Sequence, residues 1–429
     1  MIKKFFIFSI LFVYLHSDEL KVNVTASANS KMQIIICPLD ESENLKEVAN
    51  ALNRDFQISR QFDSRIEKLE NPYSKKTMKE LWNKSIPFVL FLKYLQPAEY
   101  EWRLYDTGLS QMISGKKIES EMKPDFIGHK IADQVWPLLT GKNSSFSCPI
   151  VGCKKINISN KKSYKYIYSF YLSDFLDQHK KPNLIVDAPT LNIAPRWHST
   201  KPLLYFSQHT PVNVRLVVVD ESKKQRIVTN FDGLNMTPAI SEEGSIVISL
   251  TKNGFGRLCK YFFDEKRMKG IFRSITPSDI HAISPSFINE NEIVFCHIKN
   301  RIPRIAKIDL KTNKIDYLTE SYSVSPIYCK ANNCVAYCQR VDGISQIFSY
   351  NLEKKEHKQL TKDSGDKDEC CWSPCGNFIV FSSEDKNQTR TCVLNVSNDE
   401  VVTVSPKNES WSFPSWSPNY NAVFCALFG

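Results

Sequence analysis

The C-terminal two-thirds of the chain repeats one short phrase about every 44 residues, and this period constrains the fold more strongly than any other feature of the sequence. The phrase is a proline, then a small or bulky residue, then an aromatic or aliphatic one, as in Pro-Ser-Trp-Ser-Pro at 414–418. The copies start at Pro195, Pro238, Pro285, Pro326, Cys370 and Pro414, so their spacings are 43, 47, 41, 44 and 44 residues. A fixed period of this length indicates a repeat architecture.

Each copy opens a unit of short apolar segments separated by polar turns. The anchor lies in the first segment, and the second segments are residues 203–206, 246–248, 293–295, 335–337, 379–381 and 422–425. The third segments are residues 215–220, 258–262, 304–310, 346–352 and 391–396. The fourth segments close on Thr229, Thr276, Thr319, Thr361 and Thr403. Segments of this kind predict β-strands, four to each unit.

Four strands in each of six units predict a six-bladed β-propeller, with a solenoid of strands as the alternative. A single four-stranded sheet cannot bury both of its apolar faces, whereas sheets stacked around an axis cover one another and leave few free edges. The last unit ends at Gly429 before its outer strands. We therefore predict that residues 166–174 and 183–187 complete blade six, with 422–425 as its second strand and 154–159 as a competitor for that position.

The residues before the propeller have a different pattern. Residues 32–36 form a continuous apolar run that is typical of a buried strand, and apolar residues at helical spacing follow between 45 and 56 and between 127 and 138. Residues 87–94 and 99–106 read as two strands joined by a short turn, and Asp40 with Glu43 is placed for a capping box. The sequence thus predicts an α/β domain at 32–145, a linker at 146–163 and the propeller at 164–429.

The N-terminus resembles a secretory signal. Lys3 and Lys4 precede an apolar run at 5–15, which is too short to span a bilayer but suits the core of a signal peptide. We expect a signal peptide at 1–17 and an exported mature chain, with a buried N-terminal strand as the alternative. Among the 13 cysteines, the candidates for disulfides are Cys148 with Cys153, Cys329 with Cys334, and the group Cys370, Cys371 and Cys375.

Several classes of function are disfavoured by the composition and by the motifs that the chain lacks. The net charge of +10 is spread thinly along the chain, so nucleic acid is not an expected partner. The chain has only 14 glycines and contains no glycine-rich nucleotide-binding motif. It also lacks the hydrolase motif G-x-S-x-G and the zinc protease motif H-E-x-x-H. We therefore expect no cofactor, no metal and no catalytic site. His129 is interpreted as a packing residue, and the adjacent Asp368 and Glu369 do not form an acid–base pair.

The order of these parts resembles the TolB family, the periplasmic propeller proteins of the Tol–Pal system of Gram-negative bacteria. The resemblance rests on residues 414–418, on the segments 128–133 and 139–142, and on 19–24, which lie where TolB proteins carry similar residues. Blades five and six alone keep Trp-Ser-Pro, and blade five has Cys370 where the others have proline. The resemblance implies a monomeric, non-enzymatic periplasmic scaffold that supports outer-membrane integrity and envelope constriction during cell division.

The resemblance also implies two partners. The peptidoglycan-associated lipoprotein Pal is expected at one mouth of the ring, and the inner-membrane protein TolA at a mobile N-terminal segment, residues 18–31. The residues expected to contact the Pal-like partner are Leu234, Asn235, Thr237, Ile283, Ser284, Ser325, Asp368 and Glu369. Those expected to contact the TolA-like partner are Glu19, Leu20, Lys21, Val22, Asn23 and Val24. The alternatives are an exported propeller that binds another protein or a glycan, and a hydrolase.

Overall fold

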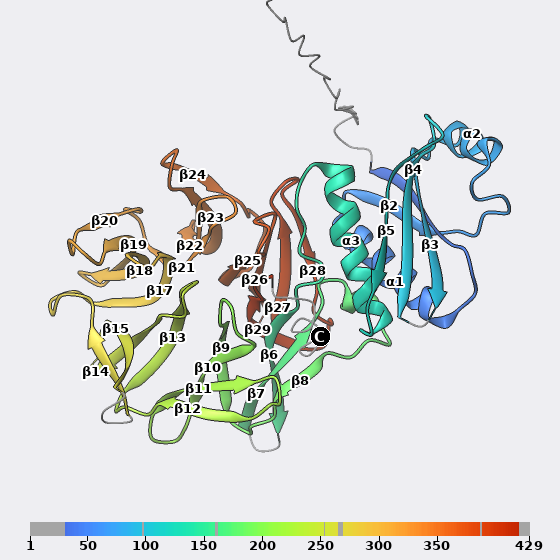
Figure 1. Ribbon diagram of the computed structural model, residues 1–429. Coiled ribbons are helices and arrows are strands. Elements are labelled where there is room, and N and C mark those ends of the chain that lie inside the picture. The colour runs from blue at the N-terminus through green and yellow to red at the C-terminus, as the bar shows by residue number, and fades with distance from the viewer. Residues whose placement is uncertain are drawn as a thin grey trace, which may run out of the picture.

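The structure is a computed structural model that describes residues 31–96, 98–158, 162–252, 254–264, 269–386 and 388–419. Within these residues a small α/β domain lies beside six blades of four strands each, arranged around an axis (Figure 1). Single parallel bridges, Val214 with Leu234 and Lys165 with Leu191, join blades six, one and two into one continuous sheet, and the other three blades are separate sheets. The predicted fold class, an α/β domain followed by a six-bladed β-propeller, is confirmed. No helix in the described part of the chain is long and apolar enough to cross a bilayer. The predicted signal peptide, residues 1–17, and the expected TolA-binding residues 19–24 lie outside the described residues.

The α/β domain is a five-stranded sheet with helices on both faces. Its strands are β1 (Met32–Pro38), β2 (Phe62–Ile66), β3 (Phe88–Gln96), β4 (Glu99–Asp106) and β5 (Gln111–Glu119), in the order β2-β1-β3-β4-β5. Strand β1 is parallel to both of its neighbours, and the remaining pairs are antiparallel. The helices are α1 (Glu43–Ile58), α2 (Lys75–Asn83) and α3 (Pro124–Thr140). Helices α1 and α3 pack on one face, as the sequence predicted, and α2 covers the other.

The start of α1 corrects the predicted capping box. The N-cap is Ser42, whose hydroxyl accepts a hydrogen bond from the backbone N–H of Leu45 at 3.3 Å. Asp40 lies before the cap, where its carboxylate accepts from the backbone N–H groups of Ser42 and Tyr94 at 3.1 and 3.0 Å. A serine hydroxyl at the N-cap reaches a free N–H of the first turn, so Asp40 is left to connect the start of α1 to β3.

Each blade of the propeller is a meander whose first strand lies nearest the axis. Blade one consists of β9 (Leu191–Trp197), β10 (Leu203–His209), β11 (Val214–Asp220) and β12 (Gln225–Thr229). Blade two consists of β13 (Leu234–Ile240), β14 (Ile246–Lys252), β15 (Phe255–Asp264) and β16 (Lys269–Ser274). Blade three consists of β17 (Ala282–Asn289), β18 (Glu292–Lys299), β19 (Ile302–Asp309) and β20 (Ile315–Tyr317). Blade four consists of β21 (Ser323–Cys329), β22 (Cys334–Val341), β23 (Ile344–Asn351) and β24 (Glu356–Gln359). Blade five consists of β25 (Asp366–Trp372), β26 (Phe378–Asp385), β27 (Gln388–Asn395) and β28 (Glu400–Thr403). All six anchors of the repeat lie in innermost strands.

Blade six joins the two ends of the ring. Its innermost strand is β29 (Ser410–Trp416), and its outer strands are β6 (Ile150–Ile158), β7 (Lys162–Phe170) and β8 (Asn183–Val186). The predicted use of residues from 166–174 and 183–187 in this blade is confirmed. The prediction of a linker at 146–163 is wrong, because β6 hydrogen-bonds to β29 on one edge and to β7 on the other and so holds the second position of the blade. Strand β6 overlaps 154–159, the alternative for this position. Residues 422–425, the first choice for it, lie outside the described residues.

The closing threonines of the repeat have a common structural role. The side-chain hydroxyls of Thr229, Thr276, Thr319 and Thr361 accept hydrogen bonds from the backbone N–H groups of Leu216, Leu258, Ile305 and Ile347, at 2.9 to 3.3 Å. In blade five the acceptor is the hydroxyl of Ser405, which accepts from the backbone N–H of Thr391 at 3.0 Å. Thr403, the closing threonine that the repeat predicted for this blade, does not have this role. Each hydroxyl thus satisfies a third-strand N–H at the point where the fourth strand ends, which a buried backbone donor requires.

The two domains share one hydrophobic core beneath blades five and six. Trp136 of α3 packs edge-on against Phe146 at 5.2 Å, and Phe146 continues to Phe378 of blade five at 6.1 Å between ring centroids. Trp416 of β29 extends the same cluster, with its ring centroid 6.2 Å from that of Phe378. The α/β domain is therefore fixed to the seam of the ring by apolar packing.

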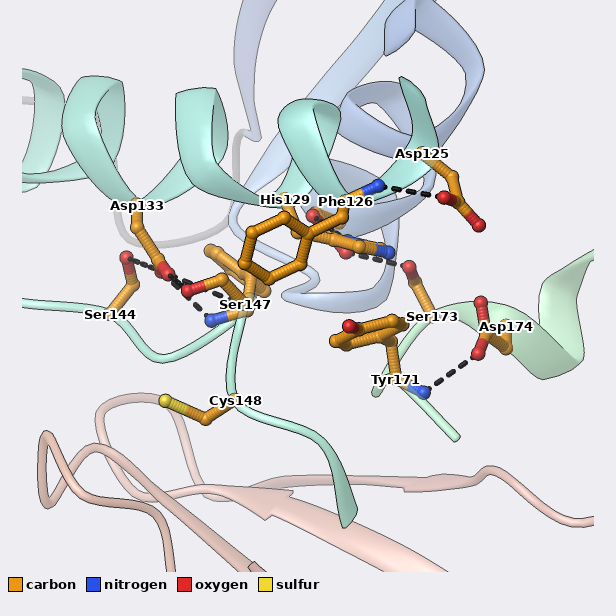
Figure 2. Close-up of polar contacts among 12 residues, drawn as sticks. Asp125, Phe126, His129, Asp133, Ser144, Ser147, Cys148, Tyr171, Ser173 and Asp174 are labelled. Atoms are coloured by element: carbon orange, nitrogen blue, oxygen red, sulfur yellow. Dashed lines mark hydrogen bonds and ion pairs between the residues drawn. The ribbon is translucent and has the colours of Figure 1, made fainter. Parts of the chain in front are cut away.

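Polar contacts among α1, α3 and the loop after β7 complete this interface (Figure 2). Nδ1 of His129 lies 2.7 Å from Oδ2 of Asp55, and the hydroxyl of Ser173 donates to Oδ1 of Asp55 at 2.6 Å. The imidazole also packs on the ring of Tyr171, with 4.4 Å between centroids. His129 is fully buried, which agrees with its interpretation as a packing residue.

The candidate disulfide pairs are not bridged in this structure, because each includes a free thiol; these are Cys153, Cys329, Cys334, Cys370, Cys371 and Cys375. Most of the described cysteines are small buried residues of strands, like Cys296 and Cys338 in the middle of the second strands β18 and β22. Burial raises the pKa of Cys296 to about 12, which keeps this thiol protonated and unreactive at neutral pH.

Candidate functional site: the mouth of the propeller channel

A repeated backbone irregularity builds the channel. The residue before each anchor has a left-handed conformation; these are Ala194, Thr237, Ser284, Ser325, Glu369 and Phe413, with φ between 45° and 57°. In every innermost strand the register with the second strand shifts around this residue, as at a β-bulge. Such φ values are uncommon outside glycine and mark positions where a strand is re-aimed. All six residues line one cavity of about 170 Å³ on the axis, so the repeat directs one side chain per blade into the channel.

Most of the residues predicted for the Pal-like partner meet at this channel. Thr237, Ser284, Ser325, Asp368 and Glu369 come from blades two to five and all line the cavity. The hydroxyl of Ser325 donates to Oδ1 of Asp368 at 3.0 Å, which links blade four to blade five. The structure therefore brings together side chains that lie more than a hundred residues apart in the chain.

The other predicted residues lie around the channel and not in it. Leu234 is exposed at the start of β13, and Ile283 is half-buried beside Gly256 of blade two. Asn235 is fully buried. Its Nδ2 donates to the backbone carbonyls of Val214 and Phe231 at 2.7 and 2.8 Å, so its amide holds the loop that enters blade two and is not accessible to a partner.

The position three residues before the anchor has this loop-holding role in other blades as well. In blade one the side-chain amide of Asn192 donates to the carbonyls of Lys165 and Ala188 at 2.8 and 3.0 Å. In blade five the fully buried Lys367 donates to the carbonyls of 363, 364 and 365 at 2.6 to 2.8 Å and pairs with the carboxylate of Asp363 at 3.1 Å. Sequence reasoning missed this role, although asparagine at the same offset in two repeats was a usable signal.

Glu369 connects blade five to the C-terminal strand. Its Oε2 accepts from the hydroxyl of Ser382 at 2.7 Å and from the backbone N–H of Phe413 in β29 at 2.6 Å. Burial, and next to it the negative charge of Asp368, raise the pKa of Glu369 to about 7. Lys165 of β7 completes the group: its Nζ donates to the hydroxyl of Ser412 at 2.7 Å and lies 4.6 Å from the centre of the Phe413 ring.

A second hollow of about 410 Å³ lies at the side of the mouth where blades four, five and six meet. Its charged lining residues include Lys165, Arg340, Asp366, Asp368, Glu369 and Glu384. Lys165, Arg340 and Glu384 were not predicted, because they come from second and third strands whose outward residues carry no repeat signal. The mouth is therefore charged and polar over these three blades.

Over blades one to four the rim of the mouth is apolar. Large apolar side chains stand 37% to 93% exposed in the loops that enter first strands or join second to third strands; they are Leu191, Val212, Phe231, Leu234, Phe255, Ile302, Tyr322 and Ile344. In an antiparallel meander these two kinds of loop share one end of the sheet. The α/β domain contacts the other end, where Asn395 donates to the carbonyl of Ser59 and the N–H of Cys375 to the hydroxyl of Ser145.

This arrangement has the properties of a docking surface. A contiguous set of exposed apolar side chains with a polar neighbourhood is typical of protein interaction sites. Within the described residues no group of three or more histidine, cysteine, aspartate or glutamate side chains is placed to hold a metal ion. The channel thus offers hydroxyls, two carboxylates and an apolar rim to a partner that inserts into the mouth.

Comparison with known proteins connects this architecture with one family. A family model described as "TolB beta propeller domain" matches residues 136–420. The chain is 22% identical over 325 residues to the Tol-Pal system protein TolB of Francisella tularensis subsp. holarctica (strain OSU18), which covers 73% of each chain. It is also 26% identical over 158 residues to the Tol-Pal system protein TolB of Rickettsia felis, over 35% of this chain and 33% of the relative.

Solved structures agree with these matches at the level of the fold. The structure of TolB from Acinetobacter baumannii superposes with a TM-score of 0.76 at 17% identity, over 91% of this chain and 98% of that one. A more distant propeller, in the hydrazine synthase of Kuenenia stuttgartiensis, has a TM-score of 0.53 at 10% identity, over 66% and 48% of the two chains. The first superposition includes the α/β domain, because it covers far more than the propeller alone.

Proposed function

We propose, because this chain belongs to the family of TolB β-propeller proteins, that it is a non-enzymatic scaffold of a Tol–Pal system in the bacterial periplasm. Its relatives from Francisella and Rickettsia carry the name Tol-Pal system protein. The proposed role is to connect a peptidoglycan-associated lipoprotein with an inner-membrane TolA-like protein. In this way the chain supports outer-membrane integrity and constriction of the envelope during cell division.

The observation that supports the proposal best is the open mouth on the end of the ring opposite the α/β domain. Its apolar rim provides area to bury, and each fully buried large apolar side chain contributes roughly 1.5–3 kcal/mol before the cost of association is subtracted. Thr237, Ser284 and Ser325 lie behind the rim and offer hydrogen bonds to an inserted loop. We assign the contact with the Pal-like lipoprotein to Leu234 and to these channel residues, with Asp368 and Glu369 at the blade-five side.

The proposed contact with a TolA-like protein rests on the family resemblance. It is assigned to residues 19–24, which precede β1 and lie outside the described residues. The two sites together make a bridge between membranes possible for a chain that acts as a monomer.

Substitution of one rim residue tests the proposal. The binding partner is the soluble domain of the Pal-type lipoprotein from the same organism, and affinity is measured by isothermal titration calorimetry. Leu234→Asp places a charge on the rim and is expected to weaken binding at least tenfold, because the charge must be desolvated in the interface. Ile227→Asp is the matched control, because Ile227 is also exposed but lies in the outermost strand of blade one. Equal affinities for both variants, or no binding by the unaltered chain, would contradict the proposal.

A further inference from the structure

A groove lies on the flank of the ring between blades five and six. It encloses about 1050 Å³. Its walls are Arg390 and Thr403 of blade five, Lys154 and Tyr168 of blade six, and the connections 175–182 and 405–409. The groove shares no lining residue with the channel cavity, so it is a separate surface. Its volume lies at the upper end of the range of small-molecule sites.

The floor of the groove is aromatic. Tyr168 and Phe175 are half-buried and pack on the fully buried indole of Trp411, with 5.6 and 5.7 Å between ring centroids. This packing fixes both rings in place, and each keeps one part of its surface open to the groove. The groove therefore presents rigid apolar faces that a flat ligand can cover with little loss of side-chain entropy.

The rim of the groove is positively charged. The lining includes Lys154, Lys180, Lys181, Arg390 and Lys407 against two carboxylates, Asp177 and Glu409. Both carboxylates are already paired: Oδ2 of Asp177 lies 3.1 Å from Nη1 of Arg54, and Oε1 of Glu409 lies 2.5 Å from Nζ of Lys154.

Three of the five cations remain available to a ligand. Lys180 pairs with Asp125 of α3, and Lys154 is held by Glu409. Arg390, Lys181 and Lys407 form no ion pair with any described residue. Because unpaired cations at the edge of a partly enclosed cavity favour a negative ligand, the groove selects for an anion.

The two properties together define the chemistry of the ligand. An apolar ring face stacks on an aromatic side chain, and carboxylate or phosphate groups pair with lysine and arginine. Saccharide rings have such an apolar face, and envelope glycans carry anionic groups. The amides of Gln178 and Asn408 add hydrogen-bonding groups for sugar hydroxyls. A nucleic acid strand would need a longer basic track than this one groove provides.

We propose that the groove between blades five and six binds an anionic saccharide, with its rings on Tyr168 and Phe175 and its acidic group on Arg390, Lys181 and Lys407. The site is additional to the mouth, and it brings the glycan to the seam where β29 closes the ring. Its shared chemistry fits two sources: the peptide-bearing sugars of the cell wall, whose anions are carboxylates, and the phosphorylated sugars of glycolipids.

The test is a binding titration of the full mature chain with defined probes. The carboxylate probe is the disaccharide tripeptide of the cell wall, the phosphate probe is a delipidated core oligosaccharide, and the neutral control is chitotetraose. We expect at least one anionic probe to bind at least tenfold more tightly than chitotetraose, with an affinity that falls as salt is raised. Which anionic probe binds identifies the source.

Charge reversal then locates the site. The double substitution Lys181→Glu with Lys407→Glu is expected to weaken binding of the anionic probe on the order of tenfold, because two exposed attractions become repulsions. The matched control is Lys201→Glu with Lys311→Glu, two exposed lysines outside the groove, which should change the affinity less than twofold. Both double variants should keep their affinity for the Pal-type lipoprotein, which separates this proposal from the proposed function.

Four outcomes would overturn the inference. They are no binding of either anionic probe, equal binding of neutral and anionic probes, unchanged affinity in the groove variant, and tighter binding of a single-stranded oligonucleotide than of any saccharide. Circular dichroism of each variant confirms that the ring is folded before its affinity is compared.

Discussion

Replacing Trp411 by alanine is predicted to loosen the ring at the seam where its two ends meet. The indole is fully buried, and its ring lies 5.6 to 5.7 Å from those of Tyr168, Phe170 and Phe175. Its Nε1 also donates to Oε2 of Glu409 at 2.8 Å. Trp411 belongs to β29, whereas its aromatic partners belong to β7 and the loop that follows it. The substitution therefore removes contacts between the last strand and the strands that precede blade one.

The expected loss is large relative to the stability of the chain. Truncation of a buried tryptophan to alanine costs about 3–5 kcal/mol, because contacts are lost and a cavity remains. A folded domain has a stability of about 5–15 kcal/mol, so this one change removes a substantial part of it. The loss of the indole N–H leaves Glu409 with Lys154 as its remaining partner, which moves the estimate to the upper half of this range.

Urea unfolding followed by far-UV circular dichroism measures this loss, because the probe does not depend on the deleted fluorophore. Trp82→Ala is the matched control: Trp82 lies in α2 and is 53% exposed, so its truncation should cost less than about 1 kcal/mol. The reasoning is refuted if Trp411→Ala shifts the unfolding midpoint no more than the control does. Two transitions with only the first one shifted would show instead that the ring unfolds separately from the α/β domain.

Three further predictions concern the channel and the N-terminal segment. Lys367→Met should destabilise the chain by about 3–5 kcal/mol in urea unfolding, because three backbone carbonyls lose their donor; a loss below 1 kcal/mol would contradict the loop-holding role. Because the pKa of Glu369 is raised to about 7 in the folded chain, above its unfolded value of about 4.3, its contribution to stability is complete below pH 4 and is lost as pH rises through 7. Glu369→Gln should therefore flatten the fall in the urea midpoint between pH 5 and pH 8, and an unchanged slope would show that another group titrates. Deletion of residues 19–24 from the mature chain should abolish capture of a TolA-like protein and leave the unfolding midpoint unchanged, and retained capture would end that assignment.

The repeat made most of the propeller predictable. The anchors Pro195, Pro238, Pro285 and Pro326 each mark an innermost strand, because proline and the bulky residue near it recur at the bulge that directs a side chain into the channel. The mouth residues were predicted next to these anchors, and five of the eight line the channel cavity.

The features that the sequence did not predict depend on contacts between distant segments. Strand β6 carries Lys154, Lys155 and Asn157 in its second half, so its polarity resembled a linker. The sequence offered 154–159 only as an alternative for the second strand of blade six, and the pairing with β29 decides between the two. Asparagine is common in turns, so Asn235 was read as a turn residue. Nothing in the local sequence distinguishes a buried side-chain amide that holds a loop from an exposed one. The raised pKa of Glu369 arises first from burial in the folded ring and then from the negative charge of Asp368, and the extent of that burial cannot be read from a single repeat.

The position of β29 has a consequence for biogenesis. The three outer strands of blade six are synthesised before blade one, but their innermost partner is made only after blade five. The growing chain must therefore hold an incomplete sheet, with the edge of β6 unpaired, until five further blades have been made. A premature stop codon ahead of β29 would leave an open arc with that edge exposed, which proteases and chaperones would meet as an unfinished product.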